Sequence, residues 1–201
     1  MKQACYDFNM KENFSIISDI LKNNGVIAFP TDTVWGMGCL VENEQAVQKI
    51  YDTKSREKNK PLILLSSRLE YLLPYIEELP SVAKKLAEKY FPGPLTLVVK
   101  KSALTPDYIT SGFDTVGIRV PAHPVFCELV EKVVPTHVLA TTSANISGMG
   151  AVARKEDVIS VDYIVDDEGI PFGGEESTVV AVDENNVVKM LRKGAIQELM
   201  I

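Results

Sequence analysis

The chain has 201 residues, of which 46% are hydrophobic and 24% are charged, and its net charge is −6 at pH 7. These proportions are typical of one folded globular domain and exclude a disordered chain. The acidic net charge disfavours sequence-independent binding to nucleic acid, which requires a broad cationic surface, but it leaves room for a local basic site.

Helical and strand patterns alternate along the first two thirds of the chain, and strands dominate the last third. Apolar spacing, capping residues and β-branched runs predict these elements in chain order: a helix over 13–24, a strand over 26–29, a helix over 44–53, a strand over 61–65, a helix over 81–91, strands over 95–99 and 116–120, a helix over 124–133, and strands over 138–142, 163–165, 178–182 and 187–191. A hairpin turn at 183–186 joins the last two strands. This order predicts a single α/β domain, residues 1–201, whose sheet has both parallel and antiparallel neighbours and is flanked by helices.

The features that bear on cellular location favour a cytoplasmic protein. Cys5, Cys39 and Cys127 are far apart and form no C-x-x-C pair, so we expect reduced thiols. Residues 1–14 interleave charged and apolar side chains, unlike a signal peptide. Residues 133–153 contain no Asp, Glu, Lys or Arg, but they are too polar to span a membrane. We therefore expect no membrane contact.

Several common catalytic motifs are missing from the sequence. No glycine is followed by lysine, which excludes a Walker A loop, and Gly36-Met37-Gly38 lacks the third glycine of a dinucleotide-binding fingerprint. His123 and His137 are the only histidines, and no cysteine has ligand spacing, so we expect no zinc site. His123 precedes a proline and is interpreted as a loop or cap residue.

The densest charge cluster is the segment 53–60, in which four cations accompany one anion. A solvated helix end explains such a run, because cations suit a helix C-terminus. A phosphate clamp is the alternative, since Arg56 offers a planar fork and the lysines offer point charges. We expect Lys58 to face solvent in either case.

Polar side chains cluster where predicted strands end. Segment 141–148 carries five hydroxyl or amide side chains. Ligands of open α/β sheets bind outside the carboxyl ends of strands, so these groups suit a phosphate, a ribose or a carboxylate. A Ser/Thr-rich turn that satisfies its own backbone is the alternative. Segments 31–33, 175–178 and 191–194 are similar polar interruptions, and Trp35 is predicted to anchor the core.

Arg119 interrupts the apolar run 116–120. Burying an unpaired guanidinium is costly, so Arg119 must meet an anion or reach water. A structural salt bridge and a clamp for a substrate carboxylate both satisfy that requirement.

Taken together, these segments resemble the YrdC family, whose characterised members are threonylcarbamoyl-AMP synthases. The matching motifs span about residues 25–194 and are, in chain order, FPTDTVWG, K-x-R followed by KPL, GPLT, VGIRVPAHP, TSANISG, ESTVV and LRKG. Because the chain ends soon after LRKG, it is similar to the short form without an appended C-terminal domain. The resemblance implies a twisted mixed sheet with helices around a deep, positively charged cavity.

The resemblance also implies a reaction. L-Threonine, bicarbonate or CO2, and ATP would give threonylcarbamoyl-AMP and pyrophosphate, for the threonylcarbamoyladenosine modification of tRNA next to the anticodon. No carboxylate cluster suggests a protein cage for a metal, so Mg²⁺ is expected on the ATP phosphates. The expected partners are these small molecules, with transient contact with the tRNA threonylcarbamoyl-transfer machinery and only weak binding of tRNA itself.

Residue roles carry over from the resemblance motif by motif. The cations expected to hold the ATP phosphates are Lys54, Arg56, Lys60 and Arg192, with Lys54 and Arg56 as the catalytic pair. The residues expected to contact the nucleotide are Ser143 and Asn145, with Thr115 and the backbone near Ala151 as further candidates. The residues expected to hold L-threonine are Thr33, Arg119, Thr141 and Ser177. Two positions depart from the family: Trp35 replaces a common tyrosine, and Leu65 replaces a histidine found in some members.

Two other functions remain as alternatives. An RNA-binding module with a basic concave surface would use the same cations, but the chain is acidic and lacks aromatic stacking strips. A related enzyme that forms a carbamoyl-adenylate would take carbamoyl phosphate, as hydrogenase-maturation proteins with a similar domain do. Those proteins are large and multidomain, unlike this chain.

Overall fold

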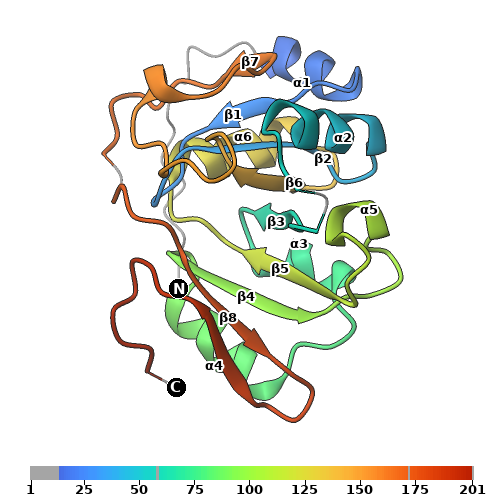
Figure 1. The fold of residues 1–201 in the computed structure, drawn as a ribbon, viewed down its shortest axis with the longest axis vertical. Coiled ribbons are helices and arrows are strands. Elements are labelled where there is room, and N and C mark those ends of the chain that lie inside the picture. Colours follow the sequence, from blue (N-terminus) through green and yellow to red (C-terminus); the bar gives the residue numbers. More distant parts are fainter. Residues whose placement is uncertain (1–13, 58, 172, 201) are drawn as a thin grey trace.

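The computed structural model describes residues 14–57, 59–171 and 173–200, and these form one mixed β-sheet with helices packed against it (Figure 1). The expectations for Cys5 and Lys58 lie outside the described residues. The strands are ordered β7-β1-β2-β6-β3-β5-β4-β8-β9 across the sheet. Their bounds are β1 Ile27–Phe29, β2 Gly36–Leu40, β3 Ile63–Ser66, β4 Leu95–Lys100, β5 Thr115–Arg119, β6 Val138–Ser143, β7 Tyr163–Ile164, β8 Thr178–Val182 and β9 Val188–Arg192.

Strand directions confirm the predicted mixed sheet. The parallel pairs are β1 with β7, β3 with β5, and β4 with β8. The antiparallel pairs are β1 with β2, β2 with β6, β3 with β6, β4 with β5, and β8 with β9. Strands far apart in the sequence therefore lie side by side, and β6 joins the N-terminal strands to the centre of the sheet.

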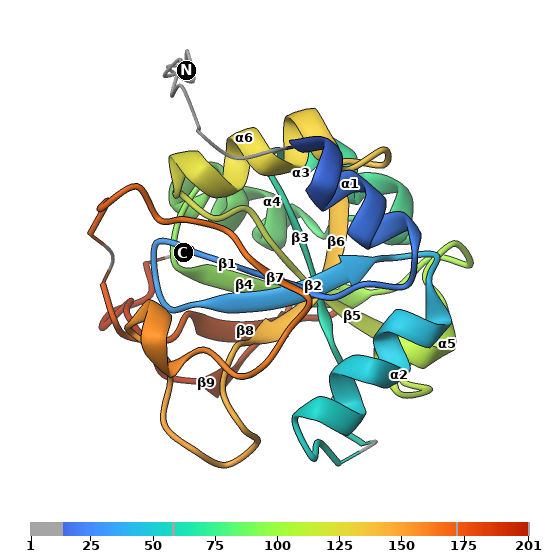
Figure 2. The same ribbon diagram turned by 90° about the horizontal axis from the view of Figure 1, so that it is seen from above.

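The helices bury apolar faces against the two sides of the sheet. Their bounds are α1 Phe14–Lys22, α2 Glu44–Thr53, α3 Leu69–Leu72, α4 Ser81–Tyr90, α5 Asp107–Thr110 and α6 Pro124–Val133, with 3₁₀ turns at Leu73–Tyr75 and Lys155–Asp157. Helices α1 and α6 lie together on one face, where Phe126 packs on Phe29 with ring centroids 5.1 Å apart (Figure 2). Helix α2 packs on the other face, and α4 packs against β4.

The long periodic segments were predicted well. Helices α2 and α6 match their predicted ranges, and α1 lies within the predicted 13–24, whose first residue is outside the described residues. Asn43 caps α2 by accepting a hydrogen bond from the Ala46 amide at 3.1 Å. His123 occupies the N-cap position of α6, but its side chain makes no capping hydrogen bond there.

Strand β2 was missed, as were the short helices α3 and α5. The sequence of β2, GMGCL, lacks the β-branched residues that indicate a strand. A Cβ atom on Gly38 would lie 2.7 Å from the Ala140 carbonyl oxygen on β6, so only glycine allows the two backbones to approach this closely. The glycines that weaken the strand pattern are therefore what the sheet requires here.

The uncharged stretch 133–153 forms the end of α6, strand β6 and the loop after it. Across the described residues, no helix combines the length and apolar character that crossing a membrane would take. Cys39 and Cys127 are free thiols, and burial raises the pKa of Cys39 to about 12 and that of Cys127 to about 11. Both thiols are therefore poor nucleophiles at neutral pH.

Candidate active site

A cavity of about 370 Å³ lies over the sheet, and side chains from both halves of the chain line it. Ten of the predicted site residues are among them: Thr33, Lys54, Arg56, Lys60, Arg119, Thr141, Ser143, Asn145, Ser177 and Arg192. Trp35 and Leu65 also line it. Trp35 is fully buried, as predicted for a core anchor, so it serves the core and the cavity wall together.

Two predicted residues lie elsewhere. Thr115 begins β5, at the opposite end of that strand from Arg119, and does not line this cavity. Ala151 lines a neighbouring cavity of about 360 Å³. The two cavities share Asn145 and Met149, so they adjoin at the loop after β6.

Lys54 is a buried cation at the C-terminus of α2. Its side chain is 1% exposed, and its Nζ donates to the carbonyl oxygens of Ser143, at 2.5 Å, and of Asn145. Burial, followed by the nearby charge of Arg56, lowers the pKa of Lys54 to about 8. The solvated helix end is therefore the wrong interpretation for Lys54, which holds the loop after β6 and brings its charge to the cavity wall.

The turn after α2 explains the K-x-R spacing. The Arg56 amide donates to the Tyr51 carbonyl at 2.9 Å, and the Ser55 amide donates to the Asp52 carbonyl at 3.1 Å. These two bonds form a Schellman motif, and Ser55 takes its left-handed position with a φ of 48°. Non-glycine residues rarely adopt that conformation. The turn ends the helix abruptly and leaves the flanking Lys54 and Arg56 both on the cavity wall.

The side chain of Arg56 is fixed by the loop that follows it. Its Nε donates to the Lys60 carbonyl at 2.9 Å, and its Nη2 donates to the Pro61 carbonyl at 3.0 Å. Burial lowers the pKa of Arg56 from its ordinary value, but arginine stays charged at neutral pH. Lys60 is exposed, and its Nζ lies 3.5 Å from Glu57 Oε1. Lys54 and Arg56 thus donate to neutral carbonyl oxygens and keep their charges uncompensated by these partners.

The segment after β6 combines the two interpretations offered for it. The Ser143 hydroxyl donates to Asn145 Oδ1 at 2.5 Å, and Asn145 Nδ2 donates to the Met149 carbonyl at 2.5 Å. These local bonds are those of a polar turn. Ser143 lines the first cavity, and Asn145 and Met149 line both, so the turn also has polar groups that could contact a ligand.

Arg119 forms the structural salt bridge that its sequence context allowed. It is 4% exposed, and its Nη2 donates to Asp32 Oδ1 at 2.6 Å while Nη1 donates to Thr33 Oγ1 at 2.8 Å. Its Nε donates to the Gly93 carbonyl at 3.0 Å. Burial lowers the pKa of Arg119, and the Asp32 charge opposes that effect. These bonds use three of the five guanidinium protons, and the other two make no hydrogen bond to the residues that the structure describes.

Arg192 and Ser177 lie together at the far wall. Arg192 Nε and Nη2 donate to the Ser177 carbonyl at 3.1 and 3.0 Å, and Nη1 lies 3.0 Å from Glu176 Oε1. A Cβ on Gly194 would lie 2.2 Å from the Glu176 carbonyl, so the glycine permits β9 to bring Arg192 this close.

Sequence reasoning missed two contributors to the site. Thr96 lines the cavity, and its Oγ1 lies 2.8 Å from Ser177 Oγ. Asp32 is the partner of Arg119 and also accepts a hydrogen bond from the Ala122 amide at 3.0 Å. Thr96 lies in the GPLT motif and Asp32 lies in FPTDTVWG, so both motifs marked the site in the sequence. The contacts of these two residues join positions more than 80 residues apart, and such pairing is not visible in a sequence.

Fold and site together define an α/β domain whose mixed sheet carries a cavity lined by buried hydroxyls and cationic side chains. The chain belongs to the Sua5/YciO/YrdC family, because the family profile, described as "Telomere recombination", matches residues 19–194.

Named relatives support that assignment. A putative threonylcarbamoyl-AMP synthase of Methanocaldococcus jannaschii is 34% identical, over 95% of this chain and 91% of its own length. The threonylcarbamoyl-AMP synthase of Pyrococcus abyssi is 38% identical over 90% of this chain, which spans about half, 54%, of that relative. The crystal structure of P. abyssi Sua5 complexed with L-threonine superposes with a TM-score of 0.82 at 35% identity, and it covers 90% of this chain and 54% of the other.

Proposed function

We propose that the chain is an L-threonylcarbamoyladenylate synthase, an ATP-dependent nucleotidyltransferase. It joins L-threonine, bicarbonate or CO2, and ATP to give threonylcarbamoyl-AMP and pyrophosphate. One observation carries the proposal: a single cavity holds Lys54 and Arg56, whose hydrogen bonds go to neutral carbonyl oxygens, together with the buried guanidinium of Arg119 and its hydroxyl neighbours. The names of the M. jannaschii and P. abyssi relatives support it.

The nucleotide would occupy the side of the cavity nearest α2 and the loop after β6. Lys54, Arg56, Lys60 and Arg192 would attract the triphosphate, because cations in a poorly solvated cavity interact strongly with anions. Ser143 and Asn145 would bind the nucleoside, and the adjoining cavity at Ala151 offers space for its base. Thr115, which lies away from the cavity, has no part in this proposal.

L-Threonine would bind near Arg119. The two guanidinium protons that carry no intramolecular bond suit its carboxylate, and Thr33, Thr141 and Ser177 offer hydroxyls for its amine and side chain. Asp32 neutralises the buried Arg119 in the absence of ligand, which lowers the cost of keeping this cation in the core.

The chemistry requires no protein nucleophile. The threonine nitrogen forms a bond to CO2 and loses a proton, giving a carbamate. A carbamate oxygen then forms a bond to the α-phosphorus as the bond to the β-phosphate oxygen breaks, and pyrophosphate leaves with the electron pair. Positioned cations lower the barrier by stabilising charge on the departing pyrophosphate. The arrangement therefore accounts for catalysis by positioning and electrostatics.

Magnesium would enter with ATP. Within the part of the chain that the structure describes, no three His, Cys, Asp or Glu side chains are grouped to hold a metal ion. Mg²⁺ keeps several waters and is commonly bound through substrate phosphates, where it supplies further charge neutralisation. We propose that the product serves tRNA modification in the cytoplasm, through transient contact with the transfer machinery.

Pyrophosphate release from ATP tests the proposal and separates its rivals. The purified protein is assayed with L-threonine and bicarbonate together, each alone, L-serine, carbamoyl phosphate, or tRNA. A synthase releases pyrophosphate only with threonine and bicarbonate together. Release with carbamoyl phosphate indicates the related carbamoyl-adenylate enzyme. Retention of tRNA without turnover, with steep salt dependence, indicates an RNA-binding module.

A further inference from the structure

A pair of hydroxyls, from buried Tyr51 and half-buried Ser111, supports the basic loop from the side away from the cavity. Tyr51, on α2, is 7% exposed, and its hydroxyl donates to the Lys60 carbonyl at 2.9 Å. The same hydroxyl lies 3.1 Å from Ser111 Oγ. Ser111 follows α5 in the left-handed conformation, with a φ of 56°. The pair therefore links α2 and α5 to the backbone of the segment 53–60.

The Lys60 carbonyl is the junction between this support and the cavity. It accepts hydrogen bonds from Tyr51 Oη and from Arg56 Nε, both at 2.9 Å. Since one oxygen receives both donors, Tyr51 sets the place of the oxygen to which the Arg56 guanidinium is fixed. A second tether from the same side joins the Leu62 amide to the Ile109 carbonyl of α5 at 2.9 Å.

We propose that Tyr51, supported by Ser111, is a positioning residue that orients Arg56 for the phosphates of ATP. The proposal rests on the proposed function, since it assigns ATP to the cavity. Tyr51 does not line that cavity, and it acts on Arg56 through the Lys60 carbonyl and through its own side-chain interaction with Arg56. Its ring packs in the core, so removal of the hydroxyl alone leaves the packing in place.

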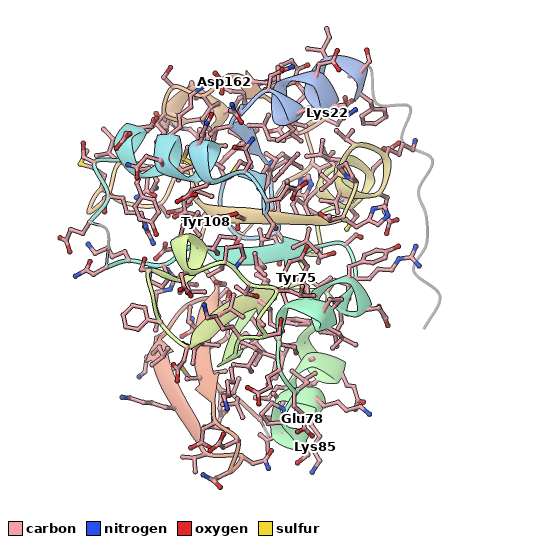
Figure 3. The ribbon with its side chains drawn as sticks, turned by 90° about the vertical axis from the view of Figure 1, so that its right-hand side faces the viewer. Lys22, Tyr75, Glu78, Lys85, Tyr108 and Asp162 are labelled. Carbon is pink, nitrogen blue, oxygen red and sulfur yellow. The ribbon has the colours of Figure 1, made fainter. Side chains whose placement is uncertain are left out.

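The Tyr51→Phe variant tests the proposal against a matched control. Tyr108 is a half-buried tyrosine on α5 (Figure 3). Its hydroxyl donates to the Val41 carbonyl at 3.0 Å. Tyr108→Phe therefore removes the same type of hydrogen bond from the same side of the fold, but it leaves the basic loop intact. Each variant loses one hydroxyl-to-carbonyl bond, and Tyr51→Phe also loses the contact with Ser111 Oγ, so Tyr51→Phe should lose somewhat more thermal stability than Tyr108→Phe.

Steady-state kinetics should separate the two variants. In Tyr51→Phe we expect the KM for ATP to rise about fivefold to tenfold, as the loss of one buried hydrogen bond predicts, with the KM for threonine within about twofold of wild type. Tyr108→Phe should keep both constants near wild type. Equal changes in both KM values, or equal behaviour of the two variants, would overturn the proposal.

Ser111→Ala supplies an independent variant. It should raise the KM for ATP by about twofold to threefold in the wild-type background and by nothing further in Tyr51→Phe, because Ser111 acts through Tyr51. Additive effects would overturn that route.

Calorimetric titration with ATP separates this proposal from the proposed function. ATP binding without threonine-dependent turnover contradicts the proposed function alone. Equal ATP affinity in wild type and Tyr51→Phe contradicts the positioning role alone. A wild-type protein that binds no ATP contradicts both.

Discussion

Replacing Lys54 by methionine separates the structural role of its side chain, which holds the loop after β6, from the electrostatic role that we propose for its charge. Methionine matches lysine in length, but it removes the charge and the donors to the Ser143 and Asn145 carbonyls. Leaving two buried carbonyls without a donor costs about 2–6 kcal/mol. The low pKa of Lys54, about 8 against 10.5, means that burying the protonated amine already costs the fold about 2–3 kcal/mol, and methionine relieves this cost. The net change in stability should lie between a gain of about 1 kcal/mol and a loss of about 4 kcal/mol.

The loss of activity in Lys54→Met should be larger than its loss of stability suggests. A positioned cation that faces the leaving pyrophosphate contributes roughly 3 kcal/mol to the barrier, so adenylate formation should fall about a hundredfold or more. The assay is threonine-dependent pyrophosphate release below the melting temperature of the variant. Arg56→Ala should show a comparable loss of rate.

Lys49→Met is the matched control for this experiment. Lys49 also lies on α2, but its Nζ pairs with Asp162 at 2.6 Å, away from the cavity. Its replacement should leave the rate unchanged and cost at most about 1 kcal/mol of stability, as for other exposed ion pairs. A folded Lys54→Met protein with a near wild-type rate would refute the role assigned to the Lys54 charge.

Four further predictions rest on the same geometry. ATP affinity should fall as the pH rises through about 8, because Lys54 loses its charge there, and titration calorimetry should find no such fall in Lys54→Met. The stability of the fold should change with pH in the opposite direction to ATP affinity. Between pH 8 and 10.5 the unfolded chain binds more protons at Lys54 than the folded chain does, so the contribution of Lys54 to the free energy of unfolding rises with pH. Denaturant titrations of wild type and Lys54→Met over this pH range measure that contribution. Arg119→Ala should weaken threonine binding far more than ATP binding by calorimetry, and equal losses would count against the carboxylate clamp. Ser55→Gly should raise the free energy of unfolding by about 0.5–1 kcal/mol by relieving the left-handed serine, whereas a destabilised variant would contradict the assigned turn.

The long periodic elements could be predicted from sequence because their boundaries are chemical. Helix α6 begins at Pro124 and α2 follows the Asn43 cap, and each buries an apolar stripe at helical spacing. Strand β2 could not be predicted in this way. The glycines of β2 are required because Gly38 lies close to the backbone of β6. That partner strand lies about a hundred residues later in the chain, so the requirement is not visible in the local sequence.

Ten of the predicted site residues line one cavity, whereas Thr115 and Ala151 do not, and the contacts among these residues were not predicted. The polar groups at strand ends were visible in the sequence, and the mixed sheet brings them to one cavity. The sequence could not reveal that the ammonium of Lys54 would hold backbone carbonyls or that Asp32 would neutralise Arg119, since both contacts join segments more than 80 residues apart. For Arg119, the salt bridge is present, and the clamp remains part of the proposal.

The most direct test of the account is the identity of the reaction product. The protein is incubated with ATP, Mg²⁺, L-threonine and ¹³C-bicarbonate, and the products are analysed at once by mass spectrometry. If triphosphate and amino acid meet in the cavity, one molecule should contain threonine, a single ¹³C atom and AMP, and its amount should match the pyrophosphate released. ATP consumption that yields no such molecule would contradict the account.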